Sequence, residues 1–189
     1  MYIQRHGESE ANSTKIYAGL KYDPPLTEYG QKQIESYLEY YSGLDLKEVI
    51  TSPSKRAIQT AEIIANHLGL PISVDKALHE VDMGDLEGKR QDDEENFKQY
   101  TSVITNWLGG DKSMSFTNGE SYEDVKERVV HVTKNYLVDD NILLVAHATF
   151  FACLMAETVK FKESIYELFL PRAGRGKYED GKWTMIDKR

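Results

Sequence analysis

The chain has 189 residues, of which 40% are hydrophobic and 29% are charged, and its net charge is -8. This composition is typical of an ordinary soluble globular protein and is too hydrophobic for a disordered one. The negative charge argues against a nucleic-acid partner, because such a partner requires a basic face that neutralises phosphates. Local positive charge must therefore attract any anionic substrate.

The sequence shows no sign of a membrane or secretory segment. No apolar stretch approaches the roughly 18 residues of a membrane-spanning helix, and the amino end lacks the pattern of a secretory signal. We therefore expect a cytoplasmic protein with no membrane partner. The single cysteine, Cys153, lies in an apolar run and has no internal disulfide partner, which indicates a core residue rather than a redox group.

Strand-like and helix-like segments alternate along the chain. In chain order, the pattern predicts a strand at 1–4, a helix at 27–41, a strand at 48–51, a helix at 54–68, a strand at 72–74, a helix at 121–137, and strands at 141–146 and 167–170. Thr27, Ser54 and Ser121 are suitable residues to cap the three helices, and Gly69 ends the second. The alternation predicts an α/β fold, a three-layer α/β/α sandwich with a mostly parallel central sheet.

One stretch interrupts this alternation, at about residues 89–118. It combines an acidic run at 92–95 with spaced aromatic residues that include Phe97 and Tyr100, and it ends near two consecutive glycines. We expect a helical insertion or lid here, within a single domain that covers residues 1–189.

Four predicted strands lead into residues that suit phosphoryl chemistry. The first ends at Arg5 and His6, and the next three lead to Arg56, Glu80 and His147. Ligands of open α/β sheets bind beyond the carboxyl ends of the strands, so we expect these side chains in one crevice. An arginine offers parallel donors to a phosphoryl group, and an imidazole nitrogen can attack phosphorus. Taken singly, each residue also has an ordinary structural interpretation.

Several motifs, in order along the chain, resemble those of the histidine phosphatase superfamily, also called the phosphoglycerate mutase-like family. They are Arg5-His6-Gly7-Glu8-Ser9 with Asn12, the segment 23–30, Ser52-Pro53 with Arg56, Leu78-His79-Glu80, Gly119-Glu120-Ser121 with Arg128, and Val145-Ala146-His147. The matching pieces span residues 2 to about 159.

The resemblance implies a role for each candidate site residue. His6 would attack phosphorus and carry a transient phosphohistidine, and Glu80 would be the general acid, with Asp82, Asp85 and Glu87 as alternatives. The phosphoryl oxygens would be bound by Arg5, Asn12, Arg56 and His147. His6 must present a neutral nitrogen, which a bond from its other nitrogen to a backbone carbonyl would ensure. No cofactor or metal is expected, because the five histidines lack paired ligand spacing.

Two positions depart from the family's pattern. Ala148 stands where glycine is usual, and we expect its methyl group to narrow the approach to phosphate and to disfavour a positive φ angle. Gln4 is polar where an apolar strand residue is usual. Neither change removes a reacting group.

We therefore expect a phosphomonoester hydrolase that acts on a small phosphorylated metabolite. The alternatives are phosphoglycerate mutase-type phosphoryl transfer and a non-catalytic domain that binds phospholigands. Hydrolysis is favoured over the mutase reaction because the chain lacks room for the longer insertion and tail of the family's phosphoglycerate mutases. The oligomeric state stays open.

The mouth of the crevice is expected at the loop 13–23 and the segment 97–116, because variable loops on a fixed scaffold select ligands. Lys15 and Lys21 suit a second anionic group of the substrate, or they are simply solvated. Two further cations either reach the crevice or stay in a surface turn, namely Arg172 and Arg175.

Overall fold

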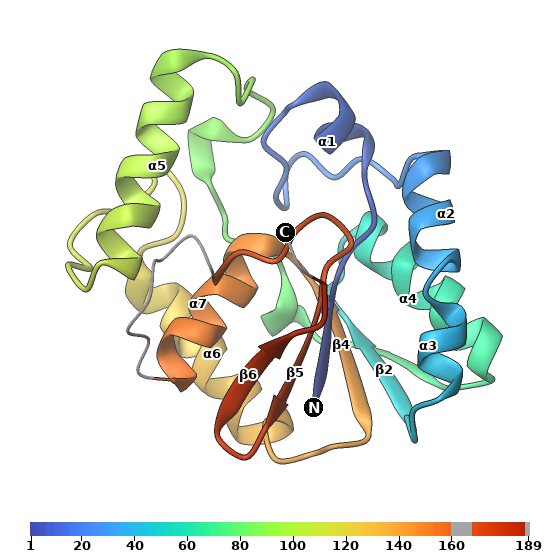
Figure 1. The fold of residues 1–189 in the computed structure, drawn as a ribbon. Coiled ribbons are helices and arrows are strands. Elements are labelled where there is room, and N and C mark those ends of the chain that lie inside the picture. Colours follow the sequence, from blue (N-terminus) through green and yellow to red (C-terminus); the bar gives the residue numbers. More distant parts are fainter. Residues whose placement is uncertain (160–167, 188–189) are drawn as a thin grey trace.

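The computed structural model describes residues 1–159 and 168–187, and its centre is a six-stranded sheet (Figure 1). The strands are β1 (Tyr2–Arg5), β2 (Glu48–Thr51), β3 (Ile72–Val74), β4 (Ile142–Ala146), β5 (Arg175–Glu179) and β6 (Lys182–Met185). They are ordered β3-β2-β4-β1-β5-β6, with parallel pairing from β3 to β1 and antiparallel pairing in β5 and β6. The expected mostly parallel sheet is confirmed.

Helices cover both faces of this sheet. They are α1 (Glu10–Thr14), α2 (Glu28–Glu35), α3 (Leu38–Ser42), α4 (Lys55–Leu68), α5 (Glu94–Leu108), α6 (Tyr122–Tyr136) and α7 (Ala148–Thr158), with short 3-10 turns η1 (Lys76–Leu78) and η2 (Gly84–Leu86). Figure 1 shows α2, α3 and α4 on one side of the strands, and α6 and α7 on the other. The three-layer α/β/α architecture is confirmed.

The central strand β4 is buried on both faces, which explains its continuous apolar sequence. Leu144 packs into a core shared with α5, α6 and α7. Its neighbours Leu143 and Val145 point the other way, into a second core shared with α2, α3 and α4. β4 is therefore buried up to Ala146, the residue before His147.

The expected helix starts are confirmed, although Ser54 precedes α4 without a side-chain cap bond, and one expected helix is divided. Ser121 forms a capping box at the start of α6, and the Thr27 hydroxyl accepts the Gly30 N–H at 2.9 Å to start α2. The predicted helix at 27–41 ends instead at Glu35, where Tyr37 N–H bonds the carbonyl of Ile34 in a tightened turn. The chain then begins again as α3.

The strand predicted at 167–170 is wrong for residues 168–170, which the structure describes. Residue 167 lies outside the described residues, and 168–170 form no strand. The edge of the sheet is instead the β5–β6 hairpin, whose turn residues Asp180 and Gly181 both have positive φ angles, of 50° and 76°. Two such residues match the twist of an antiparallel pair.

Two helices were not expected, α1 and α7. All seven residues from Thr149 to Met155 in α7 are buried, so its sequence has no polar face to show a helical period. Cys153 belongs to this run and is buried, as expected for a core residue, and burial raises the pKa of its thiol to about 12. Among the described helices, none is both long and apolar enough to cross a bilayer.

Candidate active site

The candidate site residues come together beyond the carboxyl end of β1. A cavity of about 480 Å³ opens there, and its lining includes Arg5, His6, Asn12, Arg56 and Glu80. His147 lies just behind this lining, with its ring centroid 5.1 Å from that of His6. The structure therefore gathers all six predicted residues around one cavity.

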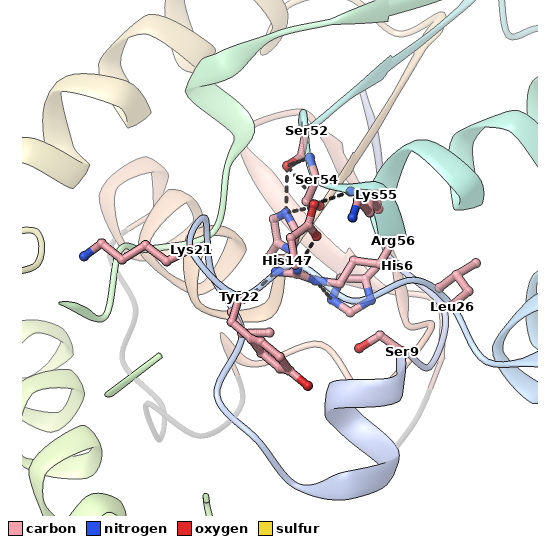
Figure 2. Close-up of polar contacts among 12 residues, drawn as sticks. His6, Ser9, Lys21, Tyr22, Leu26, Ser52, Ser54, Lys55, Arg56 and His147 are labelled. Atoms are coloured by element: carbon pink, nitrogen blue, oxygen red, sulfur yellow. Dashed lines mark hydrogen bonds and ion pairs between the residues drawn. The ribbon is translucent and has the colours of Figure 1, made fainter. Parts of the chain in front are cut away.

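His6 presents one imidazole nitrogen to the site in a defined protonation state. Its Nδ1 lies 2.7 Å from the carbonyl oxygen of Gly7, which can only accept, so Nδ1 carries the proton. The other nitrogen, Nε2, accepts from Arg56 Nε at 3.3 Å (Figure 2). Burial, followed by the charges of Arg56 and Arg5, lowers the pKa of His6 well below its usual value. The ring is therefore neutral at pH 7, with a lone pair on Nε2.

Close backbone packing holds His6 in place. Gly7 N–H donates to the Thr60 hydroxyl at 3.1 Å, and a Cβ on Gly7 would lie 2.5 Å from the carbonyl oxygen of Gly30 in α2. A Cβ on Gly30 would in turn lie 2.0 Å from the carbonyl oxygen of Glu8. Glycine at both positions lets the start of α2 contact the backbone that carries His6.

Arg5 carries a buried donor that no group among residues 1–159 and 168–187 accepts. Its Nη1 donates to the carbonyl of Leu170 at 2.8 Å, whereas its Nε is buried without a partner in the described structure. Burial lowers the pKa of Arg5 to about 10, against the opposing influence of Glu80. Arg5 therefore stays charged at neutral pH, and an orphaned buried donor at a cavity indicates a place for an acceptor on a ligand.

Arg56 connects the two histidines from the first turn of α4. Its guanidinium forms an ion pair with Asp23 at 2.9 Å, donates to the carbonyl of Ala18 at 3.3 Å, and reaches Nδ1 of His147 at 3.3 Å. The side chain is only 2% exposed, and burial lowers its pKa. These contacts leave the guanidinium little freedom to move.

His147 follows β4 and precedes α7. Because a guanidinium only donates, Nδ1 of His147 accepts from Arg56, and Nε2 carries the proton that it donates to the Ser52 hydroxyl at 2.7 Å (Figure 2). Burial, with the charge of Arg56, lowers the pKa of His147 well below its usual value. The cavity thus adjoins two neutral imidazoles.

Glu80 lies at the amino end of α7. One carboxylate oxygen, Oε1, accepts from the N–H groups of Val81 and Phe150, both at 2.9 Å, while Oε2 accepts from Thr149 N–H at 3.3 Å. Free N–H groups at a helix start favour a carboxylate there. They also fix the direction in which the carboxyl group faces the cavity.

Comparison with known proteins identifies the family. The family model described as "Histidine phosphatase superfamily (branch 1)" matches residues 1–179. The chain belongs to this superfamily. It is 32% identical over 164 residues to a protein of Cronobacter sakazakii named "Probable phosphoglycerate mutase GpmB", covering 82% of this chain and 73% of that one. It is 29% identical to "Putative phosphoserine phosphatase 2" of Hydrogenobacter thermophilus, covering 92% and 86% of the two chains.

A solved structure shares the fold of this chain. It is described as a putative alpha-ribazole-5'-P phosphatase from Escherichia coli, and the two superpose with a TM-score of 0.77 at 24% sequence identity. The match covers 97% of this chain and 92% of the other. At this identity the likeness concerns the architecture alone.

The three alternative acids, Asp82, Asp85 and Glu87, make loop contacts, and none of them is in the described lining of the cavity. Asp82 accepts from Gly84 N–H at 2.8 Å and pairs with Lys21 at 3.3 Å. Glu87 accepts from the backbone N–H groups of Lys21 and Tyr22 at 2.7 and 3.1 Å, so it shapes the loop at 18–22. Of the four candidate acids, Glu80 is the one in the described lining of the cavity.

Asn12 and Ala148 line the cavity in different ways. The Asn12 side-chain oxygen accepts from the N–H and hydroxyl of Ser9, both at 3.1 Å, in the capping box that starts α1. Ala148 is the first residue of α7 and is not among the described non-glycine residues with positive φ. The expected backbone strain at Ala148 is therefore wrong, because helical φ suits alanine; that its methyl group narrows the approach to phosphate stays a prediction.

The predicted mouth residues separate into two groups. Lys15 and Arg172 line the cavity, as do Phe97 and Tyr100 from the expected insertion, where α5 lies. Lys21 points away from the two histidines in Figure 2. Arg175 also lies elsewhere, in an ion pair with Asp187 at 2.6 Å.

An ion pair between Arg128 and Glu120, which are both mostly buried, supports the loop that carries Glu80. This role was not predicted from the sequence. Arg128 of α6 holds both carboxylate oxygens of Glu120, at 2.9 and 2.8 Å, and donates to the carbonyls of Ala77 and His79 at 2.8 and 3.0 Å. Glu120 also accepts from Asp82 N–H at 2.9 Å. The strand-end pattern could not reveal this support, since it depends on contacts between distant segments.

Proposed function

We propose that this histidine phosphatase hydrolyses small phosphomonoesters through a phosphohistidine formed on His6. The observation that carries the proposal is the pairing of a buried, unaccepted donor on Arg5 with a neutral nitrogen on His6 at one cavity. A phosphoryl group supplies both the acceptor for Arg5 and the electrophile for His6.

The reaction runs in two displacements. In the first, His6 Nε2 forms a bond to phosphorus as the ester P–O bond breaks, and Glu80 gives its proton to the leaving oxygen. In the second, Glu80 takes a proton from water, whose oxygen attacks phosphorus and releases inorganic phosphate and a free His6. Because Oε1 of Glu80 takes the two shorter backbone bonds, we assign the proton transfer to Oε2.

Fixed cations stabilise the charge of the transferring group. Arg5 and Arg56 face the cavity, and Asn12 supplies an amide donor from α1. His147 accepts from Arg56 in the free protein, so its contact with phosphate requires a proton on Nδ1. The bound dianion favours that proton, because the opposite charge is then close. Preorganised donors of this kind are the main source of phosphoryl-transfer catalysis.

We propose hydrolysis rather than the mutase reaction, although relatives of both kinds exist. The named relatives include a probable phosphoglycerate mutase and a putative phosphoserine phosphatase. The match covers 73% of the first and 86% of the second. A mutase must keep water from its phosphohistidine until the phosphoryl group returns to a second hydroxyl, so the access of water to phosphorylated His6 separates the two reactions.

The decisive experiment measures phosphate release by wild type and His6→Ala from a panel of sugar phosphates, phosphoglycerates and phosphoamino acids. We expect release by wild type and a loss of at least about a thousandfold in the variant, because the covalent route is then closed. Rapid quenching with ³²P-labelled substrate should place the label on residue 6 in wild type.

Two outcomes would contradict hydrolysis. Isomerised phosphoglycerate without free phosphate would identify a mutase. Saturable binding of phosphorylated ligands without turnover, across the whole panel, would identify a binding domain.

A further inference from the structure

The floor and the mouth of the cavity are lined by different kinds of side chain. The floor holds the phosphoryl-transfer groups described above. The mouth combines cations that already have partners with a wall of large apolar side chains. We infer that the substrate is the phosphate ester of an uncharged alcohol that offers an apolar or planar face. This inference rests on the proposed function and specifies the leaving group.

The cations at the mouth of the cavity already lie near carboxylates, although Lys15 shares Asp92 with Arg90, which binds both Asp92 oxygens at 2.8 Å. Among the described lining residues, each Lys or Arg other than Arg5 has a carboxylate partner: Arg56 with Asp23 at 2.9 Å, Arg172 with Glu8 at 2.9 Å, and Lys15 with Asp92 at 4.0 Å. Arg5 and Arg56 are the cations that the proposed function assigns to the phosphoryl group, so Arg172 and Lys15 are the two left for any second anion. A carboxylate on the leaving group would have to displace Glu8 or Asp92, and exchanging one carboxylate for another at an exposed cation gains little.

Large apolar side chains form part of the same cavity lining as these paired charges. Six large side chains contribute to the lining: Ile16, Tyr17, Met83, Phe97, Tyr100 and Phe169. The rings of Tyr17 and Tyr100 lie 5.1 Å apart, and the Tyr100 hydroxyl is held by the Thr149 hydroxyl at 3.0 Å. The wall is therefore partly fixed before a ligand arrives.

Phe97 is the exposed part of that wall. It lies in the first turn of α5 and is 56% exposed, although it is a large apolar residue. A ligand face that covers the Phe97 ring removes apolar surface from water and gains affinity that a small polar leaving group does not gain.

The first test compares three phosphate esters with wild type: 2-phenylethyl phosphate, glycerol 3-phosphate and 3-phosphoglycerate. All three release a primary aliphatic alcohol, so differences in kcat/KM report binding of the leaving group rather than the reactivity of an aryl ester. We expect kcat/KM for 2-phenylethyl phosphate to exceed that for glycerol 3-phosphate by about tenfold, with 3-phosphoglycerate lowest.

The second test uses two variants, each with a matched control. Phe97→Ala should lower the ratio of kcat/KM for 2-phenylethyl phosphate over glycerol 3-phosphate by about fivefold, whereas Tyr29→Ala, at an exposed aromatic residue on α2 outside the lining, should leave the ratio unchanged. Glu8→Gln frees Arg172 and should raise kcat/KM for 3-phosphoglycerate relative to glycerol 3-phosphate. Glu123→Gln, which breaks a surface pair with Lys126, is its control.

The outcomes separate this inference from the proposed function. If wild type releases phosphate fastest from 3-phosphoglycerate, or if Phe97→Ala leaves the ratio unchanged, the leaving-group assignment is overturned while hydrolysis stands. If wild type releases phosphate from none of the three esters or from the wider panel, the proposed function fails and the inference fails with it.

Discussion

Two imidazoles are kept neutral at the ends of neighbouring strands. His6 follows β1 and His147 follows β4, and these strands pair in parallel. Each ring gives one proton to a fixed acceptor, a carbonyl for His6 and a serine hydroxyl for His147. Arg56 then reaches the remaining nitrogen of both rings, at 3.3 Å in each case. One arginine therefore discourages protonation of both histidines.

This arrangement makes stability depend on pH. The pKa values of His6 and His147 are well below the usual 6.5 in the folded protein. As pH falls below about 6.5, the unfolded chain binds protons that the folded chain does not, so the free energy of unfolding decreases by up to about 1.4 kcal/mol per pH unit for each histidine. Above that pH both states are neutral at these positions and this contribution is constant.

Urea denaturation of His147→Gln between pH 7.5 and 5 tests this expectation. The decrease in the free energy of unfolding below pH 6.5 should be shallower in the variant than in wild type. His67→Gln, which replaces an exposed histidine on α4, should retain the wild-type slope. Equal slopes in all three proteins would contradict the account.

At the level of secondary-structure elements, the loop that carries Glu80 is held from two helices. The amino end of α7 binds the carboxylate of Glu80 through backbone N–H groups, and Arg128 of α6 binds two carbonyls of the loop. The Arg128–Glu120 pair is also bidentate, and both side chains are mostly buried, so its geometry is specific. The position of the proposed acid thus depends on residues that do not touch the substrate.

Arg128→Lys should therefore lower kcat about tenfold with little change in KM, because a lysine cannot reproduce the two-pronged contact. The free energy of unfolding should fall by about 2 kcal/mol. Steady-state kinetics and urea denaturation measure the two effects. Arg175→Lys, which breaks the similar pair with Asp187 away from the cavity, should reduce stability while kcat is retained. An unchanged kcat in Arg128→Lys would contradict the positioning role.

Elements with local signals could be predicted from the sequence. Thr27, Ser54 and Ser121 marked helix starts, and the buried strands had apolar runs. The β5–β6 hairpin was missed because its strands are half-exposed and polar, with sequences RGKYE and KWTM. The helix α7 was missed for the opposite reason, since it is apolar on nearly every side.

At the scale of the whole molecule, Gln4 joins three distant segments. Its amide nitrogen donates to the carbonyl of Ala173 at 3.0 Å, and its oxygen accepts from the hydroxyl of Tyr41 in α3. Ala173 has a φ of 53°, a left-handed conformation that costs alanine about 1 kcal/mol. The bond from Gln4 and that from Ala173 N–H to the His6 carbonyl at 3.3 Å offset this strain. The polar residue at position 4 therefore has a structural reason.

Gln4→Leu should reduce the free energy of unfolding by about 2 to 3 kcal/mol, because it leaves the buried Tyr41 hydroxyl and Ala173 carbonyl without partners. Tyr41→Phe removes one of these bonds and should cost less. Urea denaturation of the two single variants and the double variant checks this. Equal losses in both single variants would contradict the central place of Gln4.

The residues of the candidate site could be predicted from the sequence. The residues that hold them in position could not. Strand ends and motifs point to His6, Arg56 and Glu80 because the fold brings the carboxyl ends of parallel strands together. The partners that orient them, such as Asp23 for Arg56 and the Leu170 carbonyl for Arg5, are separated from them by 33 and 165 positions. No local sequence pattern predicts such pairings, because they form only when distant segments come together in the folded chain.

The lone thiol of Cys153 offers an intrinsic reporter on this protein. It is buried in the helix whose first turn holds Glu80, and burial raises its pKa to about 12, so a water-soluble alkylating reagent reaches it only when that helix separates from its neighbours. The rate of alkylation under native conditions therefore counts these opening events without any engineered label. Inorganic phosphate should slow the labelling, since a ligand that binds only the closed form makes opening rarer.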